Sequence, residues 1–329
     1  MGNGKSKQQS PGTIVTQTKK SSVPVVNPDA LLSIHFLWTK SHSLYSKMSF
    51  NIAREICLYL GRLPELLYYC DHVVYRVNPV QRTTERFFEI DYEFGDSVVD
   101  VQAAVFLSKD EVFLLMRDAS YSREDYASYA IFKETLRWVQ CNAKERLACA
   151  LLYDPCRLCV YIFGGHGVDN PDLPGSPSPS DSQVGEKFQL SNCSTERLPD
   201  MLEPRSAHAV CWHHHCVYIC GGTQLSIETF HPESLTYTKV CALPEMVSNG
   251  VAFSYQGSLY LLRGLTLWKK TAANLQITAI NSREEERTWW SAPYSVAIVG
   301  DCCSFIIYDQ CATLDLSKLT QTSYTLSPN

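Results

Sequence analysis

Three short segments of the chain place cysteines and histidines close enough together to suggest metal chemistry. They read WHHHC (residues 212–216), CRLC (156–159) and DCCS (301–304). Thiolate and imidazole groups are the usual ligands of Zn²⁺. A strong zinc signal also needs a second Cys-x-x-Cys pair at a regular distance, and the sequence has none. We therefore interpret these segments as exposed turns and expect no metal site and no cofactor.

The sequence contains no recognisable arrangement of a nucleophile with its base. The acidic and basic segment REEER (residues 283–287) is typical of a solvated loop. A catalytic centre would need a titratable group placed beside a second group that activates it. The sequence therefore predicts no catalytic residue and a protein that is not an enzyme.

The first ten residues, MGNGKSKQQS, match the pattern for N-myristoylation. Removal of the initiator methionine exposes the Gly2 amine, Ser6 is the small hydroxyl residue that the acyltransferase accepts, and Lys7 is a basic residue of the kind often found next. One myristoyl chain binds a membrane only marginally, so a second signal is required. Residues 1–22 carry four lysines and no acidic residue, which favours binding to anionic lipid. We expect residues 1–29 to be a disordered basic tail carrying this signal.

Composition limits the remaining classes of protein. The 329 residues are 45% hydrophobic and carry a net charge of −5. A basic stripe interleaved with aromatic residues is absent from the sequence, so we expect no nucleic-acid partner. No apolar run approaches the roughly 20 residues that cross a bilayer. The fourteen cysteines, with no apolar leader, indicate reduced thiols and a cytoplasmic protein that is peripheral to a membrane.

A repeated strand pattern organises most of the chain. Alternating apolar residues with an aromatic residue lead to a double glycine in VYIFGG (160–165) and again in VYICGG (217–222). Related segments occupy residues 57–62, 112–117, 259–264 and 304–309, at spacings of 42 to 57 residues. The longest spacing contains a Pro/Ser-rich insertion, residues 168–182. A period near 50 with short strands is typical of a β-propeller.

The segment EPRSAHAVCWHHHCVYICGG resembles a kelch repeat, with Pro204, Arg205 and His208 followed by Gly221 and Gly222. The next segment, FHPESLTYT, resembles the kelch link between the third and fourth strands, with Tyr237 where tryptophan is usual. The resemblance covers about residues 45–327. It implies structural repeat positions, with Arg205 bonding to backbone carbonyls and His208 supporting the packing of its blade. The other repeat positions are Gly61, Trp138, Gly164, Gly165 and Gly264.

The resemblance implies an all-β fold over residues 30–329, a kelch-type propeller of six blades with four antiparallel strands each. Five blades is the alternative if residues 30–91 form a separate cap. The segment IHFLWTK (34–40) is a candidate strand for closing the ring. Glycine is expected to end the second strand because the chain turns where a Cβ atom would clash and where φ is positive.

The kelch resemblance also implies a function, that of a non-catalytic scaffold for protein interactions with cytoskeletal proteins among the familiar partners. Two alternatives stay open. Residues 48–70 have apolar residues at helical spacing and faintly resemble an F-box, which would make the protein a substrate receptor of a ubiquitin ligase. Some kelch-like propellers are carbohydrate-active enzymes. Candidate binding loops are residues 117–124, the insertion 168–182, whose Ser176, Ser178 and Ser180 are phosphorylation candidates or a passive spacer, and 269–274.

Overall fold

The computed structural model describes parts of one compact unit of the chain. Two units are distinguished, residues 1–56 and 57–329, and every described residue belongs to the second. The expected tail with Gly2, Ser6 and Lys7, the segment 34–40 and residues 48–62 lie outside the described residues. The described residues are 65–70, 73–79, 81–90, 99–108, 111–118, 127–133, 135–140, 146–166, 181–263, 266–270, 275–279, 281–282, 296–299, 301–307 and 310–326.

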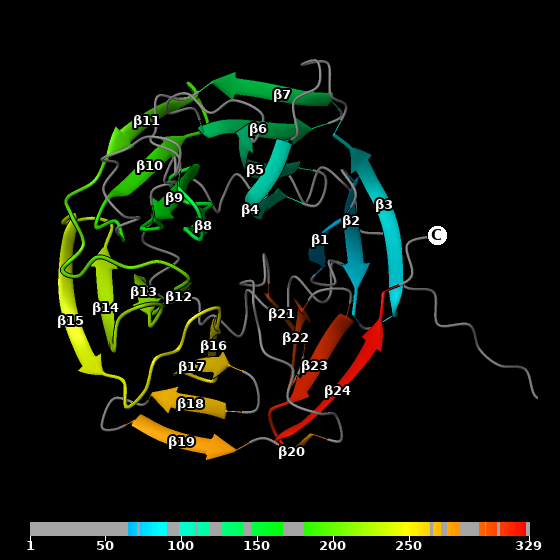
Figure 1. Ribbon diagram of the computed structural model, residues 1–329, viewed down its shortest axis with the longest axis vertical. Helices are drawn as coiled ribbons and strands as arrows, with labels where there is room; N and C mark the ends of the chain where they lie inside the picture. The colour runs from blue at the N-terminus through cyan, green and yellow to red at the C-terminus, as the bar shows by residue number, and fades with distance from the viewer. Residues whose placement is uncertain are drawn as a thin grey trace, which may run out of the picture. The chain divides into compact units, whose positions relative to one another are not determined.

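The described residues form six β-sheets arranged as a ring and contain no helix (Figure 1). Three sheets occupy the middle of the chain. They are β8 (Ala150–Asp154), β9 (Cys159–Phe163), β10 (Gly185–Gln189) and β11 (Ser194–Arg197); β12 (Ala209–His213), β13 (Cys216–Cys220), β14 (Ser226–His231) and β15 (Thr236–Ala242); and β16 (Val251–Tyr255), β17 (Ser258–Arg263), β18 (Thr266–Lys270) and β19 (Leu275–Ala279).

The remaining sheets come from the two ends of the described chain. They are β1 (Leu66–Cys70), β2 (Val73–Asn78) and β3 (Thr83–Glu89); β4 (Val99–Ser108), β5 (Glu111–Asp118), β6 (Ala127–Lys133) and β7 (Thr135–Gln140); and β21 (Val296–Val299), β22 (Cys302–Ile307), β23 (Gln310–Asp315) and β24 (Thr320–Thr325), to which the short β20 (Asn281–Ser282) adds in parallel. Neighbouring strands within each sheet are otherwise antiparallel and consecutive in sequence.

The protein is therefore a β-propeller with five four-stranded blades, and the expectation of six such blades is wrong. Within the described residues the sixth sheet, β1–β3, has three strands. The predicted strands at 112–117, 259–264 and 304–309 overlap β5, β17 and β22, the second strands of their blades, the last with a displacement of two residues. The predicted first repeat was anchored on residues 57–62, which lie outside the described residues; the first described strand begins at Leu66.

The hairpins identify which strands the sheet β1–β3 contains. In β10–β11, β14–β15 and β23–β24, four residues join the third strand to the fourth, and the last of these has positive φ, as in Cys193, Leu235 and Leu319. The β2–β3 hairpin has the same length, with Arg82 at the equivalent position with φ 56°. Both β2–β3 and β14–β15 also shift register after the second residue of their first strand. Strands β1–β3 thus correspond to the second, third and fourth strands of a blade.

Hydrophobic contacts between adjacent sheets hold the ring together. A separate buried cluster lies between each pair of neighbours, including the pair that joins the two ends of the described chain, where Leu66 and Val77 meet Ala297 and Cys311. Aromatic side chains contact one another in the cluster between β8–β11 and β12–β15, where the Tyr161 and Phe230 rings lie 5.5 Å apart. A four-stranded sheet is apolar on both faces here, so it is stable only when both faces are covered.

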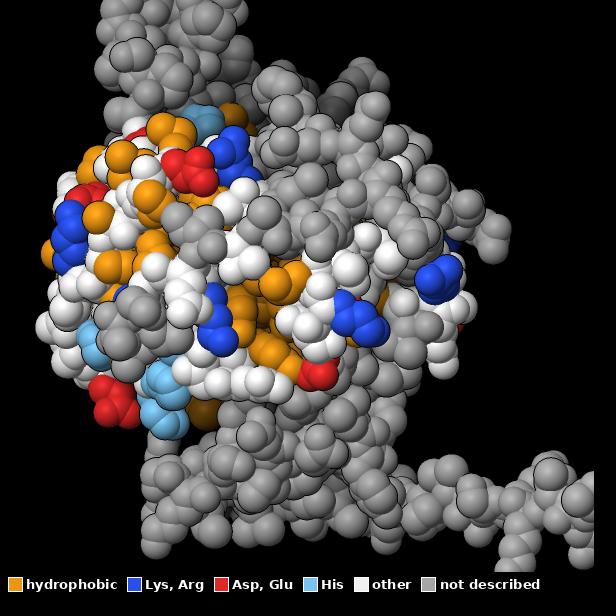
Figure 2. Space-filling model, turned by 90° about the horizontal axis from the view of Figure 1, so that it is seen from below, with side chains coloured by type: hydrophobic (Ala, Val, Ile, Leu, Met, Phe, Trp, Pro, Cys, Tyr) orange, Lys and Arg blue, Asp and Glu red, His pale blue; other side chains and the backbone are white. Residues whose placement is uncertain are grey.

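The outermost strands carry the polar surface of the ring. In β11 and β15, exposed residues outnumber buried ones, as expected of strands that face solvent along one edge. Figure 2 shows acidic and basic side chains of the described residues interspersed with hydrophobic and uncharged ones on one side of the molecule. Among the described residues there is no helix long and apolar enough to cross a membrane.

The ring has two ends with different connections. We call one the double-glycine end; it comprises residues 146–149, 164–166, 181–184, 198–208, 221–225 and 243–250. The other is the hairpin end, with the turns 155–158, 190–193, 214–215, 232–235 and 256–257. Alternation of antiparallel strands places the connections from strand two to three and from blade to blade at the first end, and the hairpins at the second.

At the double-glycine end, each glycine pair links two blades through its backbone. The first glycine bonds within its own blade, from Gly221 N to Ser226 O at 3.0 Å, and the second bonds to the next blade, from Gly222 N to Val247 O at 2.9 Å. Gly164 and Gly165 repeat this arrangement with Val184 and Arg205 as acceptors. A Cβ atom on Gly222, whose φ is +79°, would lie 2.2 Å from the Ser206 carbonyl oxygen. Only glycine allows this approach.

A second line of backbone hydrogen bonds joins the loops that precede the innermost strands. Ala207 N donates to Ala148 O at 2.8 Å, and Asn249 N donates to Ala207 O at 2.7 Å. All three residues have positive φ, between 51° and 55°, although none is a glycine. Non-glycine residues pay for this conformation with strain, which the surrounding contacts must offset. The repetition shows that successive blades meet in the same way.

The close approach at Gly222 predicts a large loss of stability in Gly222→Ala. The added methyl group must displace the Ser206 backbone and also adopts an unfavourable φ, so we expect the free energy of unfolding to fall by about 3 kcal/mol. The measurement is urea unfolding followed by tryptophan fluorescence. Gly257→Ala is the matched control, because Gly257 also has positive φ, +72°, but a Cβ atom there meets nothing within 4 Å. We expect it to cost about 1 kcal/mol; equal losses in the two variants would contradict the clash.

Candidate functional site

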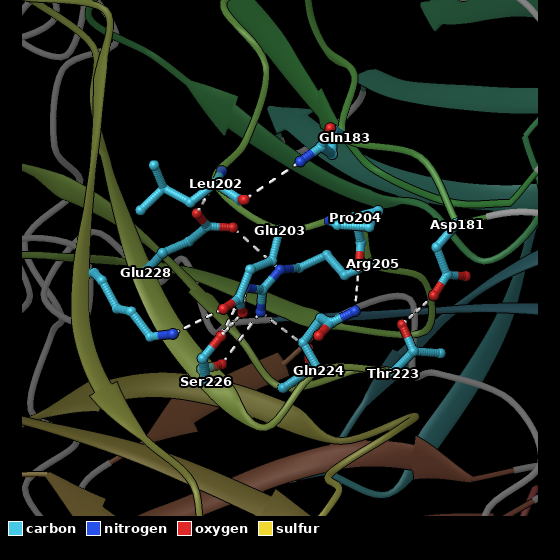
Figure 3. A network of polar contacts seen from close by, with 12 residues as sticks. Asp181, Gln183, Leu202, Glu203, Pro204, Arg205, Thr223, Gln224, Ser226 and Glu228 are labelled. Atoms are coloured by element: carbon cyan, nitrogen blue, oxygen red, sulfur yellow. Dashed lines mark hydrogen bonds and ion pairs between the residues drawn. The ribbon is translucent and has the colours of Figure 1, made fainter.

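Arg205 lies at the centre of a polar network at the double-glycine end (Figure 3). Its side chain is completely buried. One guanidinium nitrogen, Nη1, donates to Gly221 O at 3.1 Å and to Ser226 O at 3.2 Å, and Nη2 donates to the Ser226 hydroxyl at 3.0 Å. The residue therefore ties the loop before β12 to the connection between β13 and β14 of the same blade.

Two carboxylates neutralise the charge of Arg205. Glu228, also buried, places Oε1 3.1 Å from Arg205 Nε and accepts a hydrogen bond from Leu202 N at 3.0 Å. Glu203 contacts Arg205 Nη2 at 3.4 Å and Lys239 Nζ at 2.7 Å. Burial raises the pKa of Glu228 while Arg205 lowers it, whereas hydrogen bonds from Lys239 and Ser226 lower the pKa of Glu203. A buried guanidinium is tolerated only with such partners.

The preceding blade contains a second arginine of the same kind, which the sequence analysis missed. Arg146 donates from Nη1 to Val184 O at 3.0 Å and pairs with Glu186 at 3.0 Å. It stands two residues before Ala148, as Arg205 stands two residues before Ala207. The signal that would have found it is the repeat Arg-x-Ala-x-Ala, present as RLACA and RSAHA. In the following blade Val247 takes the equivalent position, so the arginine is not general.

His208 is buried beside both glycine pairs. A Cβ atom on Gly164 would lie 2.8 Å from its Cε1 atom, and one on Gly222 would lie 2.8 Å from its Cβ atom. Neither ring nitrogen has a hydrogen-bond partner within the described part of the chain. Burial, with a smaller contribution from Arg205, lowers the pKa of His208 to about 3. The ring is therefore uncharged at neutral pH and fills space between blades.

Three large apolar side chains are exposed at the double-glycine end. Leu202 is 47%, Leu225 50% and Met246 49% exposed. Their loops are joined by hydrogen bonds: the Gln224 side chain donates to Pro204 O at 2.8 Å, and Leu243 N donates to Leu225 O at 2.9 Å. Exposed apolar side chains on a hydrogen-bonded rigid surface are what a protein-binding face offers.

The cysteine and histidine segments lie at the hairpin end. Cys156 is exposed in the β8–β9 turn, the residues 213–216 surround the β12–β13 turn, and Cys302 begins β22. No group of three metal-ligating side chains that could hold an ion occurs among the described residues. Arg157 in the β8–β9 turn lies 3.5 Å from Glu233 in the β14–β15 turn, so turns of neighbouring blades meet here too.

The other predicted repeat positions are distributed through the blades. Trp138 lies in β7, and the Tyr237 ring in β15 lies 4.9 Å from that of Phe230 in β14. Gly61 and Gly264 lie outside the described residues, as do most residues of the candidate binding loops 117–124 and 168–182. The ends of the second loop are described: His166 pairs with Asp181, whose side chain accepts a hydrogen bond from the Thr223 hydroxyl of the next blade.

Comparison with known proteins adds no family to this description. No protein-family model matches the chain, and no curated protein matches it significantly. The class of protein, a β-propeller, therefore comes from the structure.

Burial of His208 predicts that stability falls in acid. Its pKa is about 3 in the folded protein and about 6.5 when unfolded. Below pH 6.5 the His208 ring binds a proton in the unfolded chain but not in the folded protein. Because of His208 alone, the free energy of unfolding should therefore fall by about 2 kcal/mol between pH 7 and pH 5. Urea unfolding at both values measures this.

In His208→Leu we expect the fall in the free energy of unfolding between pH 7 and pH 5 to shrink by about 2 kcal/mol. A comparable part should remain, because burial also lowers the pKa of His213 to about 4. A slope unchanged in His208→Leu would show that His208 is already protonated or exposed in the folded protein.

Proposed function

We propose that the protein is a non-catalytic scaffold that binds another protein through its double-glycine end. The observation that carries this proposal is the set of three half-exposed apolar side chains, Leu202, Leu225 and Met246, on loops held by the Arg205 network and by the hydrogen bond from Gly222 N to Val247 O. Binding energy at protein interfaces is concentrated in a few side chains, and a surface that loses little freedom on association keeps more of it.

The rigidity of this end supports the assignment. Arg205 and Glu228 hold the backbone of the loop that carries Leu202, and the inter-blade hydrogen bond from Gly222 to Val247 holds the loop that carries Met246. A preorganised surface avoids the entropic cost of ordering loops on binding. The net charge of −5 favours a protein partner over a nucleic acid, which would require a positive surface.

The kelch family is the proposed relationship within the propeller class. It rests on the segment from Pro204 to Gly222 and on the double glycines. The proposed location is the cytoplasm, at the surface of a membrane reached by the acylated basic N-terminus, and the cytoskeletal class of partner follows from the family resemblance. The ubiquitin-ligase and carbohydrate-enzyme alternatives have no specific observation in their favour.

The interaction proposal predicts that one end of the ring carries the binding energy. We expect Leu202→Asp combined with Met246→Asp to reduce recovery of the partner more than tenfold, because truncating central apolar contacts costs about 2 kcal/mol each. The measurement is affinity capture from cells with quantitative mass spectrometry, comparing each recovered protein with its recovery by the unchanged chain.

Leu158→Asp combined with Leu235→Asp is the matched control. These leucines are 42% and 37% exposed, but they lie in turns of the hairpin end. Partners lost with both double variants, or with the hairpin-end variant alone, would refute binding at the double-glycine end. Thermal unfolding of both variants checks that the fold is retained.

The membrane proposal predicts covalent labelling at the N-terminus. Cells supplied with an alkyne analogue of myristate should label the chain, and Gly2→Ala should abolish the label because the acyltransferase requires an N-terminal glycine. In Lys5→Ala combined with Lys7→Ala, we expect a fraction of the chains to keep the label, and the protein to be released from anionic membranes. Equal labelling of the wild type and Gly2→Ala would overturn the proposal.

A further inference from the structure

The second strands of three blades begin with a cysteine, and each cysteine faces a different residue. Cys159 begins β9 and pairs with Gln189, and Cys302 begins β22 and pairs with Asp315. Cys216 begins β13, where Val217 pairs with Phe230, so the next residue pair along the ladder is Cys216 with His231. One position of the repeat therefore carries three chemical environments, and a single one of these contains an imidazole.

The Cys216 and His231 side chains are in direct contact. Cys216 Sγ lies 3.1 Å from His231 Nδ1. On the other side of the ring, His231 Nε2 lies 3.4 Å from the Thr229 hydroxyl, which itself lies 3.3 Å from Thr238 O. A carbonyl can only accept, so the Thr229 hydroxyl donates to it and must accept from Nε2–H. His231 Nδ1 then has no proton and accepts the one from the Cys216 thiol.

A thiol, an imidazole base and a hydroxyl that orients the base form the arrangement that activates a nucleophile. We propose that Cys216 is a reactive thiol, oxidised by hydrogen peroxide and alkylated by soft electrophiles with His231 as its base. Cys216 is partly exposed, which gives small reagents access. Of the other three cysteines of this blade, Cys211 and Cys220 are buried and Cys241 is partly exposed.

Oxidation of the Cys216 thiol needs no reactant other than hydrogen peroxide. His231 Nδ1 takes the thiol proton, and the thiolate sulfur attacks one oxygen of the peroxide. The S–O bond forms as the O–O bond breaks, and the departing hydroxide takes the proton from His231, leaving sulfenic acid and water. Sulfur is oxidised and the peroxide is reduced. With iodoacetamide, the S–C bond forms, iodide leaves and the proton passes to solvent.

The ionisable groups beside Cys216 differ from those beside Cys302. Burial raises the pKa of both thiols, and the carboxylates of Asp315 and Asp301 raise that of Cys302 further. The titratable groups that face Cys216 are His231 from β14, His213 from β12 and Tyr218 from β13, while Lys270 of the neighbouring blade acts on Cys241. None of these facing groups is a carboxylate, so the imidazole acts on Cys216 without opposition from negative charge.

The test compares the two cysteines within one folded chain. The full chain is treated with iodoacetamide at pH 7, and alkylation of each cysteine is followed by mass spectrometry of its peptide. We expect Cys216 to react about tenfold faster than Cys302, because the imidazole takes up the Cys216 proton whereas the neighbouring carboxylates keep the Cys302 thiol protonated. In His231→Gln the rate at Cys216 should fall to that of Cys302, with Cys302 unchanged. In about 8 M urea, which unfolds most domains, the two rates should become equal.

Further measurements test the reactivity of Cys216 if His231→Gln does not fold. Thr229→Val keeps the shape but removes the acceptor for Nε2–H, so it should slow Cys216 alone. In the wild type, the rate at Cys216 should rise with pH at a lower midpoint than at Cys302, and peroxide followed by dimedone should trap a sulfenic acid at Cys216. Equal rates for the two cysteines in the folded protein, or a Cys216 rate unaffected by both substitutions, would overturn the proposal.

Discussion

Backbone contacts between neighbouring blades set the geometry of this propeller. At the double-glycine end, the amide of Gly165 reaches the carbonyl of Arg205 and the amide of Gly222 reaches that of Val247, and both distances are 2.9 Å. The first glycine of each pair faces the same neighbour: a Cβ atom on Gly164 would lie 2.3 Å from Arg205 O, and one on Gly221 would lie 2.6 Å from Val247 O. These contacts determine how closely the sheets approach, and the apolar clusters between the sheets fill the distance that remains. The hydrophobic effect stabilises the ring, but the backbone decides its dimensions.

Buried arginine–glutamate pairs also fix the conformation of the loops at this end. Arg205 and Arg146 each bring a guanidinium into the interior and are neutralised by a glutamate from the third strand of their own blade, Glu228 and Glu186. A buried ion pair adds little net stability, but breaking it leaves an uncompensated charge, so alternative loop conformations are disfavoured. The gain is a defined loop conformation. That conformation presents Leu202 and its neighbours to a partner.

The two ends of the ring are suited to different functions because different structural constraints act on their loops. Loops at the double-glycine end are constrained by inter-blade contacts, which makes them suitable as a rigid binding surface. Turns at the hairpin end each close two strands, and neighbouring blades meet there through Arg157 and Glu233. Their residues vary between blades. The first position of the second strand shows this variation, since the cysteine there faces glutamine, histidine or aspartate according to the blade. Function on such folds resides in local substitutions of this kind.

Local patterns in the sequence were sufficient to predict the all-β class, the second strands and the hairpin in residues 230–238, because each depends on alternation and turn chemistry over a few residues. They were not sufficient for the number of complete blades, since weak terminal repeats lack the glycine pair. The partners of Arg205 also required the structure: Glu228 is 23 residues away in sequence and meets it only after β13 and β14 have paired. The contact between Cys216 and His231 is of the same kind. Strand register decides which side chains face each other, and register is a property of the folded sheet rather than of any single strand.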